Sequence, residues 1–164
     1  MKTVVVAGNP KPGSRTLDAG IRLAARLGAD PLDIVDVVQL GPGLLGWGDP
    51  GVKDALELVA GADLAVVASP TFKATYSGLL KLFLDQFATG DGLRDVVAVP
   101  LMLGAGPAHA LAPELLLKPV LVELGAVCPA PGLYQLDRTY AEDSSAADYA
   151  DRWQPAIRAA LRHR

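Results

Sequence analysis

The sequence predicts a doubly wound α/β domain, in which helices cover both faces of a five-stranded parallel sheet. Short apolar runs bounded by turn residues alternate along the chain with segments whose apolar residues have helical spacing. Such runs are typical of buried strands, and strands that alternate with helices form parallel sheets. The chain has 164 residues, a length typical of one domain with a substantial core.

The elements follow from these patterns in order. Strands are predicted over residues 3–8, 33–38, 64–68, 95–103 and 127–136, and helices over 16–27, 52–60, 77–87, 109–124 and in a tail from residue 144. Pro113 and Pro119 interrupt the fourth helix, and Pro129 and Pro131 make the fifth strand irregular. Residues 39–50 are rich in Gly and Pro and are predicted to form a loop.

Five strands in a chain of this length favour the flavodoxin-like strand order 2-1-3-4-5 over the dinucleotide-binding order. Ligands of such sheets bind beyond the carboxyl ends of the strands, at the switch point between strands one and three. The loops at residues 8–16, 69–76 and 103–109 are therefore the candidate binding loops. We predict a single domain over residues 1–164, with a core over 1–137 and a helical tail over 138–164.

Composition argues against several other classes. The net charge is −3, and 51% of the residues are hydrophobic, unlike a disordered chain or a protein with a basic face for nucleic acid. No apolar run is long enough for a membrane span or a signal peptide. One Cys and two His provide neither an intrachain disulfide nor a structural zinc cluster. We expect a cytoplasmic protein without a metal, a membrane or a nucleic-acid partner.

The first candidate loop has the features of a phosphate site. Gly8 and Gly13 have the spacing of a P-loop, but Ser14 stands where the P-loop lysine would be. The hydroxyls of Ser14 and Thr16, with Arg15 at a helix N-terminus, suit a single phosphate group instead. The alternative is that Ser14 simply caps the helix, and the loop alone leaves both interpretations open.

The second loop presents two aromatic residues after a buried strand. A planar ring could lie against Phe72 or Tyr76 and hydrogen-bond to the neighbouring backbone. The alternative is that these aromatics pack over the end of the sheet. Lys81 and Asp85 stand four residues apart on the following helix, which predicts an exposed ion pair of little energetic consequence.

The third loop and two isolated residues complete the candidates. Gly104 and Gly106 would let a ligand approach the backbone closely. His109 is either a donor to that ligand or an ordinary residue at a helix N-terminus. Cys128 is predicted to be a small core residue rather than a nucleophile. No catalytic triad or carboxylate pair is apparent, so an enzyme with this sequence would depend on a cofactor.

Three motifs along residues 1–137 carry a family resemblance. They are Ala7-Gly8-Asn9-Pro10 with Ser14-Arg15-Thr16, the run SPTFKATYSGLLK at 69–81 with Asp85, and Ala108-His109 leading to LKPVL at 117–121. In these motifs the chain resembles the NAD(P)H-dependent FMN reductases, especially the flavin reductases of two-component alkanesulfonate-utilisation systems. The resemblance implies a flavodoxin-like fold with FMN at the switch point, and dimers that often pair into tetramers.

The resemblance also implies which residues bind FMN. Ser14, Arg15 and Thr16 would hold the phosphate, and Asn9, where the family usually has Ser, would still bond to phosphate through its amide. Residues 70–73 with Ser77 would lie along the isoalloxazine ring, and residues 104–106 would complete the pocket. The expected cofactor-binding residues are therefore Asn9, Ser14, Arg15, Thr16, Pro70, Thr71, Phe72, Lys73, Ser77, Gly104, Ala105 and Gly106.

We therefore expect an NAD(P)H:FMN reductase that uses NADPH or NADH as hydride donor. The protein would position the nicotinamide and flavin rings for hydride transfer. A flavin-dependent monooxygenase is a candidate partner. One alternative is an enzyme that keeps its FMN and reduces quinones, azo dyes or metal ions. The other is a non-enzymatic flavodoxin-like electron carrier, which the small net charge does not favour.

The fourth helix carries two further expectations. Apolar residues surround it nearly completely, which predicts at least a dimer, because one face suffices to cover a sheet. Leu115 stands where the alkanesulfonate-type reductases have a Tyr on a helical bulge at the subunit interface. Since Leu has no hydroxyl to satisfy, we expect a regular helix here, firmer FMN binding and reduction of a separate acceptor by bound flavin.

Overall fold

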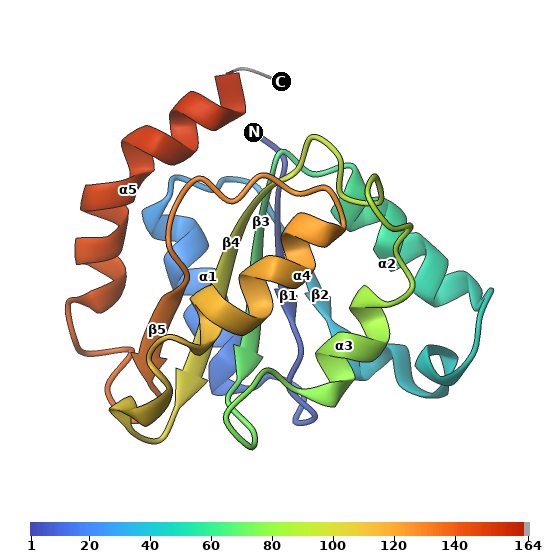
Figure 1. The fold of residues 1–164 in the computed structure, drawn as a ribbon, viewed down its shortest axis with the longest axis horizontal. Coiled ribbons are helices and arrows are strands. Elements are labelled where there is room, and N and C mark those ends of the chain that lie inside the picture. The colour runs from blue at the N-terminus through green and yellow to red at the C-terminus, as the bar shows by residue number, and fades with distance from the viewer. Residues whose placement is uncertain (163–164) are drawn as a thin grey trace.

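Five parallel strands form one sheet in the order β2-β1-β3-β4-β5, which confirms the predicted order (Figure 1). The computed structural model describes residues 1–162. The strands are β1 (Thr3–Ala7), β2 (Leu32–Asp36), β3 (Leu64–Pro70), β4 (Val97–Gly104) and β5 (Leu133–Leu136). β1 lies between β2 and β3, and Ala7 pairs with Asp36 on one side and Ala68 on the other. The switch point therefore lies where β1 and β3 end.

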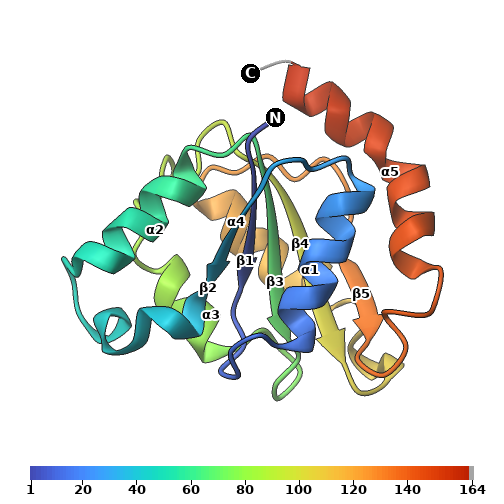
Figure 2. The same cartoon turned by 180° about the vertical axis from the view of Figure 1, so that it is seen from behind.

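Helices cover both faces of the sheet (Figures 1 and 2). One face carries α1 (Arg15–Arg26) and α5 (Ser145–Arg162), and the other carries α2 (Pro50–Ala60), α3 (Gly78–Leu84) and α4 (Lys118–Glu123). The alternation along β1 divides its side chains between the two layers. Val4 and Val6 pack toward α2, α3 and α4, whereas Val5 packs toward α1 and α5.

Several boundaries differ from the sequence prediction. The loop expected over 39–50 contains 3₁₀ turns at Val37–Leu45, with a kink at Gly41, where φ is 55°. α3 ends at Leu84 rather than at residue 87. The fifth strand is only four residues long, and upstream of it Val127 forms a single isolated bridge to Val97. Between that bridge and β5 lie Pro129 and Pro131, which have no N–H for a ladder.

The fourth helix is broken into three segments, and the prediction of a regular helix at Leu115 is wrong. A 3₁₀ turn at Pro107–His109 precedes a π-helical turn at Pro113–Leu117, which leads into α4. The N–H of Lys118 donates to the carbonyl of Pro113, five residues earlier. Pro119 has no N–H to donate to Leu115, so the wide turn follows from a proline and needs no side-chain hydroxyl.

An ion pair fastens this π turn to the segment before β5. The Glu114 carboxylate accepts from Lys118 Nζ at 2.9 Å and from the N–H of Gly132 at 2.7 Å, and Lys118 Nζ also donates to the carbonyl of Ala130. Burial by itself raises the pKa of Glu114, but these hydrogen bonds outweigh it and the pKa is lowered. The π turn and the entry to β5 therefore form one connected unit.

The C-terminal tail is helical, as predicted, and packs on the sheet beside α1. Ala150 and Ile157 of α5 are buried, and Tyr149 Oη donates to the carbonyl of Pro131 at 2.6 Å. No helix among residues 1–162 combines the length and the apolar character needed to cross a membrane.

Candidate functional site

A cavity of about 460 Å³ opens where β1, β3 and β4 end, and we call it the switch-point cavity. All three candidate loops contribute to it. Of the predicted binding residues, those that line it are Asn9, Ser14, Arg15, Thr16, Pro70, Thr71, Phe72, Gly104 and Ala105. An adjoining hollow of about 570 Å³ shares Thr71, Gly104 and Ala105 with it and is also lined by Lys73 and Gly106. The structure thus brings together all the predicted binding residues except Ser77.

The first loop is held in place by its own side chains. Ser14 Oγ accepts from the N–H of Leu17 at 3.2 Å, which makes Ser14 the N-cap of α1. Asn9 Nδ2 donates to Thr16 Oγ1 at 2.9 Å. The N–H of Gly13, whose φ is 59°, donates to the carboxylate of Asp36 at 3.0 Å. The two interpretations of Ser14 are therefore compatible, because it caps a helix whose positive N-terminal end faces the cavity.

Arg15 lies at the mouth of the switch-point cavity with its guanidinium mostly exposed. Its Nη1 donates to the carbonyl of Asp137 at 3.0 Å, and its Nη2 lies 3.6 Å from the Asp137 carboxylate. Asp137 follows β5 and lines the same cavity, although it belongs to none of the three candidate loops. This contact joins segments 122 residues apart, so no spacing in the sequence signals it.

The second loop is a tight hairpin beside the cavity. Phe72 and Thr75 exchange two backbone hydrogen bonds, at 2.8 and 3.1 Å, across a two-residue turn. Lys73 and Ala74 both have positive φ, 51° and 70°, as a type I′ turn requires. Because such turns favour Asn-Gly, this turn stores strain of about 1 kcal/mol or more per residue. Other interactions of the loop must offset this unfavourable conformational free energy.

The two aromatic residues of this loop have different environments. Phe72 is 47% exposed and lines the switch-point cavity. Tyr76 instead packs against the core under α2, α3 and α4. The ring-contact interpretation therefore applies to Phe72, and the packing interpretation applies to Tyr76.

Ser77 does not reach the cavity. Its side chain is buried, its Oγ donates to the carbonyl of Gly8, and the same atom accepts from the N–H of Leu80 at 3.0 Å. Its own N–H donates to Ser69 Oγ at 2.9 Å. Ser77 thus caps α3 and ties it to the end of β1, and it supports the binding loops from beneath.

The third loop passes very close to a tyrosine of β5. A Cβ placed on Gly104 would lie 1.8 Å from Tyr134 Oη, so any larger residue there would displace the phenol. Beside it, Thr71 Oγ1 lies 3.3 Å from the same Cβ position, is buried and has no hydrogen-bond partner among residues 1–162. An unpartnered hydroxyl beside a bare backbone fits a flat ring with polar edges. Together with the α1 N-terminus, these features fit FMN.

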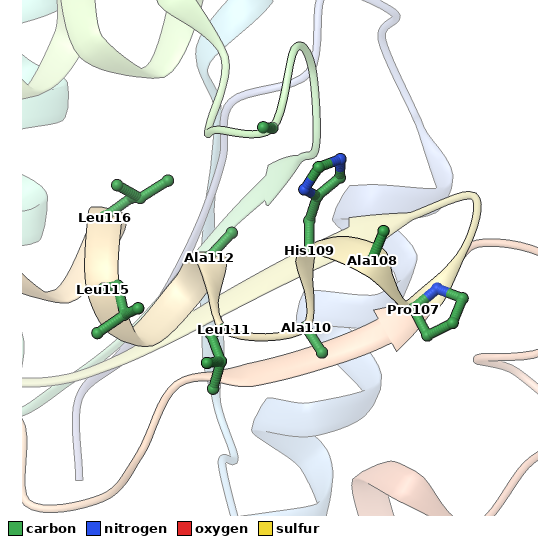
Figure 3. Close-up of a pocket in the computed structure, with 9 residues that line it drawn as sticks. Pro107, Ala108, His109, Ala110, Leu111, Ala112, Leu115 and Leu116 are labelled. Atoms are coloured by element: carbon green, nitrogen blue, oxygen red, sulfur yellow. The ribbon is translucent and has the colours of Figure 1, made fainter.

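The remaining candidates lie outside this arrangement or at its edge. Cys128 belongs to the apolar surroundings of the core, and burial raises the pKa of its thiol to about 11, as expected of a core residue and not of a nucleophile. Lys81 and Asp85 form the predicted exposed ion pair. His109 is exposed on its 3₁₀ turn and lines both the adjoining hollow and a third hollow of about 430 Å³, which Leu111 and Leu115 also line (Figure 3).

Comparison with known proteins identifies the family. The family model for NADPH-dependent FMN reductases matches residues 1–141. The chain belongs to the NADPH-dependent FMN reductase family. The predictions of a flavodoxin-like oxidoreductase with FMN as cofactor are thereby confirmed.

Individual relatives agree with this assignment. The "FMN reductase (NADPH)" of Escherichia coli K12 is 33% identical over 161 residues, which are 94% of this chain and 80% of that protein. The "NADH-dependent FMN reductase SfnF" of Pseudomonas putida is 32% identical over 143 residues, 82% of this chain and 76% of that protein. The crystal structure of an NADH:FMN oxidoreductase (EMOB) in its apo form superposes with a TM-score of 0.82, at 28% identity, over 99% of this chain and 90% of that one.

Proposed function

We propose that this FMN reductase binds FMN in the switch-point cavity as a substrate, reduces it with NADPH or NADH, and releases it to a separate flavin-dependent monooxygenase. The observation that carries this proposal is the meeting, in one cavity, of a phosphate-type loop and a ring-type surface. The first loop supplies one end and the Phe72 hairpin with Gly104 supplies the other. This spacing along one cavity suits a flavin with a single terminal phosphate.

The phosphate end depends on positive charge and hydroxyl groups. Ser14, Arg15 and Thr16 lie at the start of α1, so backbone N–H groups, two hydroxyls and a guanidinium line the same end of the cavity. Arg15 is already close to Asp137, and a bound phosphate would take over part of that interaction. Asp137 thus keeps the guanidinium at the cavity mouth before the ligand arrives.

At the ring end of the cavity, the proposed role of the protein is to orient the flavin ring, and the reaction needs no acid or base from it. The chemistry that FMN supplies when bound is acceptance of a hydride from the nicotinamide. Pro70, Thr71, Phe72, Ala105 and Gly106 would contact the ring. These residues orient the ring and limit its contact with water. The adjoining hollow, which Lys73 also lines, would leave room beside the ring for the nicotinamide nucleotide.

Two observations support released rather than retained flavin. Phe72 and Arg15 are both substantially exposed, so residues 1–162 leave both ends of the cavity open. The π turn at Pro113–Leu117 is the kind of bulge that the resemblance associates with the two-component reductases, although Leu115 replaces their tyrosine. The expectation of firmer FMN binding rested on a regular helix, and that premise has failed. We also propose a cytoplasmic location, in keeping with the single free cysteine.

The absorbance of the purified protein and its nucleotide oxidation with and without added FMN test this proposal. A releasing reductase should purify nearly colourless and oxidise NADPH or NADH only when FMN is added, with saturation in FMN. A yellow protein that needs a quinone or another acceptor, and gains nothing from added FMN, would support the retained-flavin alternative. Absence of nucleotide oxidation under both conditions would contradict both enzymes.

We further propose that the active unit is at least a dimer formed through the outer side of the π turn. Leu111, Leu115 and Val122 are 65%, 62% and 52% exposed, and Leu111 and Leu115 project from the same side of this segment (Figure 3). Leu117 and Leu121 already cover the sheet. The outward leucines therefore form a second apolar surface that another subunit would bury.

Leu115→Lys is expected to dissociate this oligomer, because a charge in the centre of an apolar contact loses its hydration. Sedimentation at micromolar concentration should show the wild-type chain as a dimer or tetramer and the variant in a smaller form. The matched control is Leu45→Lys, at a leucine that is 78% exposed elsewhere, on the 3₁₀ turns after β2. A wild-type monomer with full activity, or dissociation by the control alone, would contradict this interface.

A further inference from the structure

We propose that Tyr134 is a positioning residue for the flavin ring, acting through the loop that follows β4. This inference rests on the proposed function and adds to it a residue that neither the motifs nor the resemblance singled out. Tyr134 lies on β5, half-buried, and its phenol reaches sideways to the end of the neighbouring strand. There it lines the adjoining hollow together with Thr71 and Gly106.

The contact between Tyr134 and this loop is both polar and steric. Tyr134 Oη donates to the carbonyl of Gly106 at 2.7 Å. The same oxygen packs on Gly104 so closely that a Cβ there would lie 1.8 Å from it and 2.7 Å from Cζ. One side chain thus fixes both ends of the three-residue segment 104–106. The carbonyl of Gly104 is fixed as well, by the N–H of Asp137 at 2.9 Å.

This anchoring matters because the segment contains two glycines, which have many accessible backbone conformations. Without the phenol hydroxyl, the peptide at Gly106 loses its tether and is free to rotate. The flavin ring would lie over the surface that this segment forms with Thr71, whose hydroxyl is 3.3 Å from the Cβ position of Gly104 and has no hydrogen-bond partner among residues 1–162. The orientation of the peptides at 105 and 106 therefore decides which polar atoms meet the ring. Tyr134 sets that orientation before the flavin binds.

A second tyrosine of the chain provides a matched comparison. Tyr149 Oη also donates to a backbone carbonyl, that of Pro131, at 2.6 Å. Tyr149 is more buried than Tyr134 and lines none of the three hollows at this end of the sheet. Removing either hydroxyl deletes one tyrosine-to-carbonyl hydrogen bond, but only one of these bonds shapes the ring site.

The test compares Tyr134→Phe with Tyr149→Phe by titrating FMN and riboflavin into each protein and recording thermal midpoints. Tyr134→Phe should weaken the binding of FMN and of riboflavin by the same factor, about 2- to 10-fold, which is the range expected for one hydrogen bond. It should also alter the visible difference spectrum of bound flavin and lower the thermal midpoint no more than Tyr149→Phe does. Tyr149→Phe should leave both affinities and the spectrum unchanged.

Other outcomes would overturn the inference. Unchanged flavin affinities in Tyr134→Phe, with normal binding by the wild-type chain, would remove Tyr134 from the ring site while leaving the proposed function intact. A loss confined to FMN would place its effect at the phosphate, and an equal loss in Tyr149→Phe would make it a general effect of stability. A wild-type chain that binds neither flavin would overturn the proposed function and this inference together. As a second variant, Gly104→Ala should also weaken the binding of both FMN and riboflavin, because its Cβ displaces the same phenol.

Discussion

The Gly8→Ala variant should lose about 3 kcal/mol of folding free energy, with weaker FMN binding as a consequence. A Cβ on Gly8 would lie 2.3 Å from Leu80 Cβ and 3.0 Å from Leu80 Cα, so the obstacle includes backbone. The helix cannot simply retreat, because Ser77 ties the start of α3 to the carbonyl of Gly8. Overpacking of a rigid contact costs about 1–3 kcal/mol or more, and here it also breaks a buried hydrogen bond.

Urea denaturation of Gly8→Ala beside Gly46→Ala measures this effect. Gly46 has φ of −148° and would meet nothing within 4 Å of an added Cβ, so its replacement should change stability by less than about 0.5 kcal/mol. FMN titration of the same proteins shows whether the binding loops move with α3. If both variants are equally stable, β1 and α3 are not packed as closely as described.

Arg15→Ala should weaken FMN binding by about 10-fold and leave riboflavin binding nearly unchanged. A hydrogen bond to a charged group is worth about 1.5–3 kcal/mol, and the lower end applies because the Arg15 side chain is 64% exposed and therefore screened by solvent. Riboflavin has no phosphate, so it loses nothing when the guanidinium is removed. Fluorescence titration of both flavins gives the two dissociation constants directly.

The control for this prediction is Arg22→Ala on the same helix. Arg22 pairs with Asp18 at 2.7 Å and lines none of the hollows described above, so its removal should affect neither flavin. The double change Ser14→Ala with Arg15→Ala should weaken FMN further, but it also removes a helix cap worth about 1 kcal/mol of stability. Equal weakening of FMN and riboflavin by Arg15→Ala would show that the phosphate binds elsewhere.

The fold was predictable from the sequence because parallel strands are buried on both faces. β1 and β3 are wholly buried, so they appear in the sequence as unbroken apolar runs between turn residues. The number of strands and the chain length then favoured the observed strand order, and the positions of the candidate loops follow from that order. β5 was the least well predicted strand, because its residues alternate between buried and half-buried and prolines precede it.

The residues that line the cavity were predicted where they belong to one continuous loop, and missed where distant segments meet. Asp137 contacts Arg15 and Tyr134 contacts Gly106, and each contact exists only once β5 lies beside β4. Ser77 is the opposite case, because it was predicted as a binding residue and does not line the cavity. Its hydroxyl stands in a binding motif, but a cap on α3 and the carbonyl of Gly8 occupy it. The regular helix expected at Leu115 is wrong because the missing N–H of Pro119, and not the side chain at position 115, decides the helix type.

The complete burial of β1 has a consequence for the chain before it folds. Thr3–Ala7 is uncharged, largely β-branched and free of proline, which are the properties of a segment that pairs with copies of itself when exposed. Lys2 on one side and Pro10 on the other are the charge and the breaker that oppose such pairing. Substitutions that destabilise the centre of the sheet therefore expose this segment to pairing with other chains. In a cell, such substitutions are therefore expected to increase aggregation of the protein as well as to reduce flavin reduction.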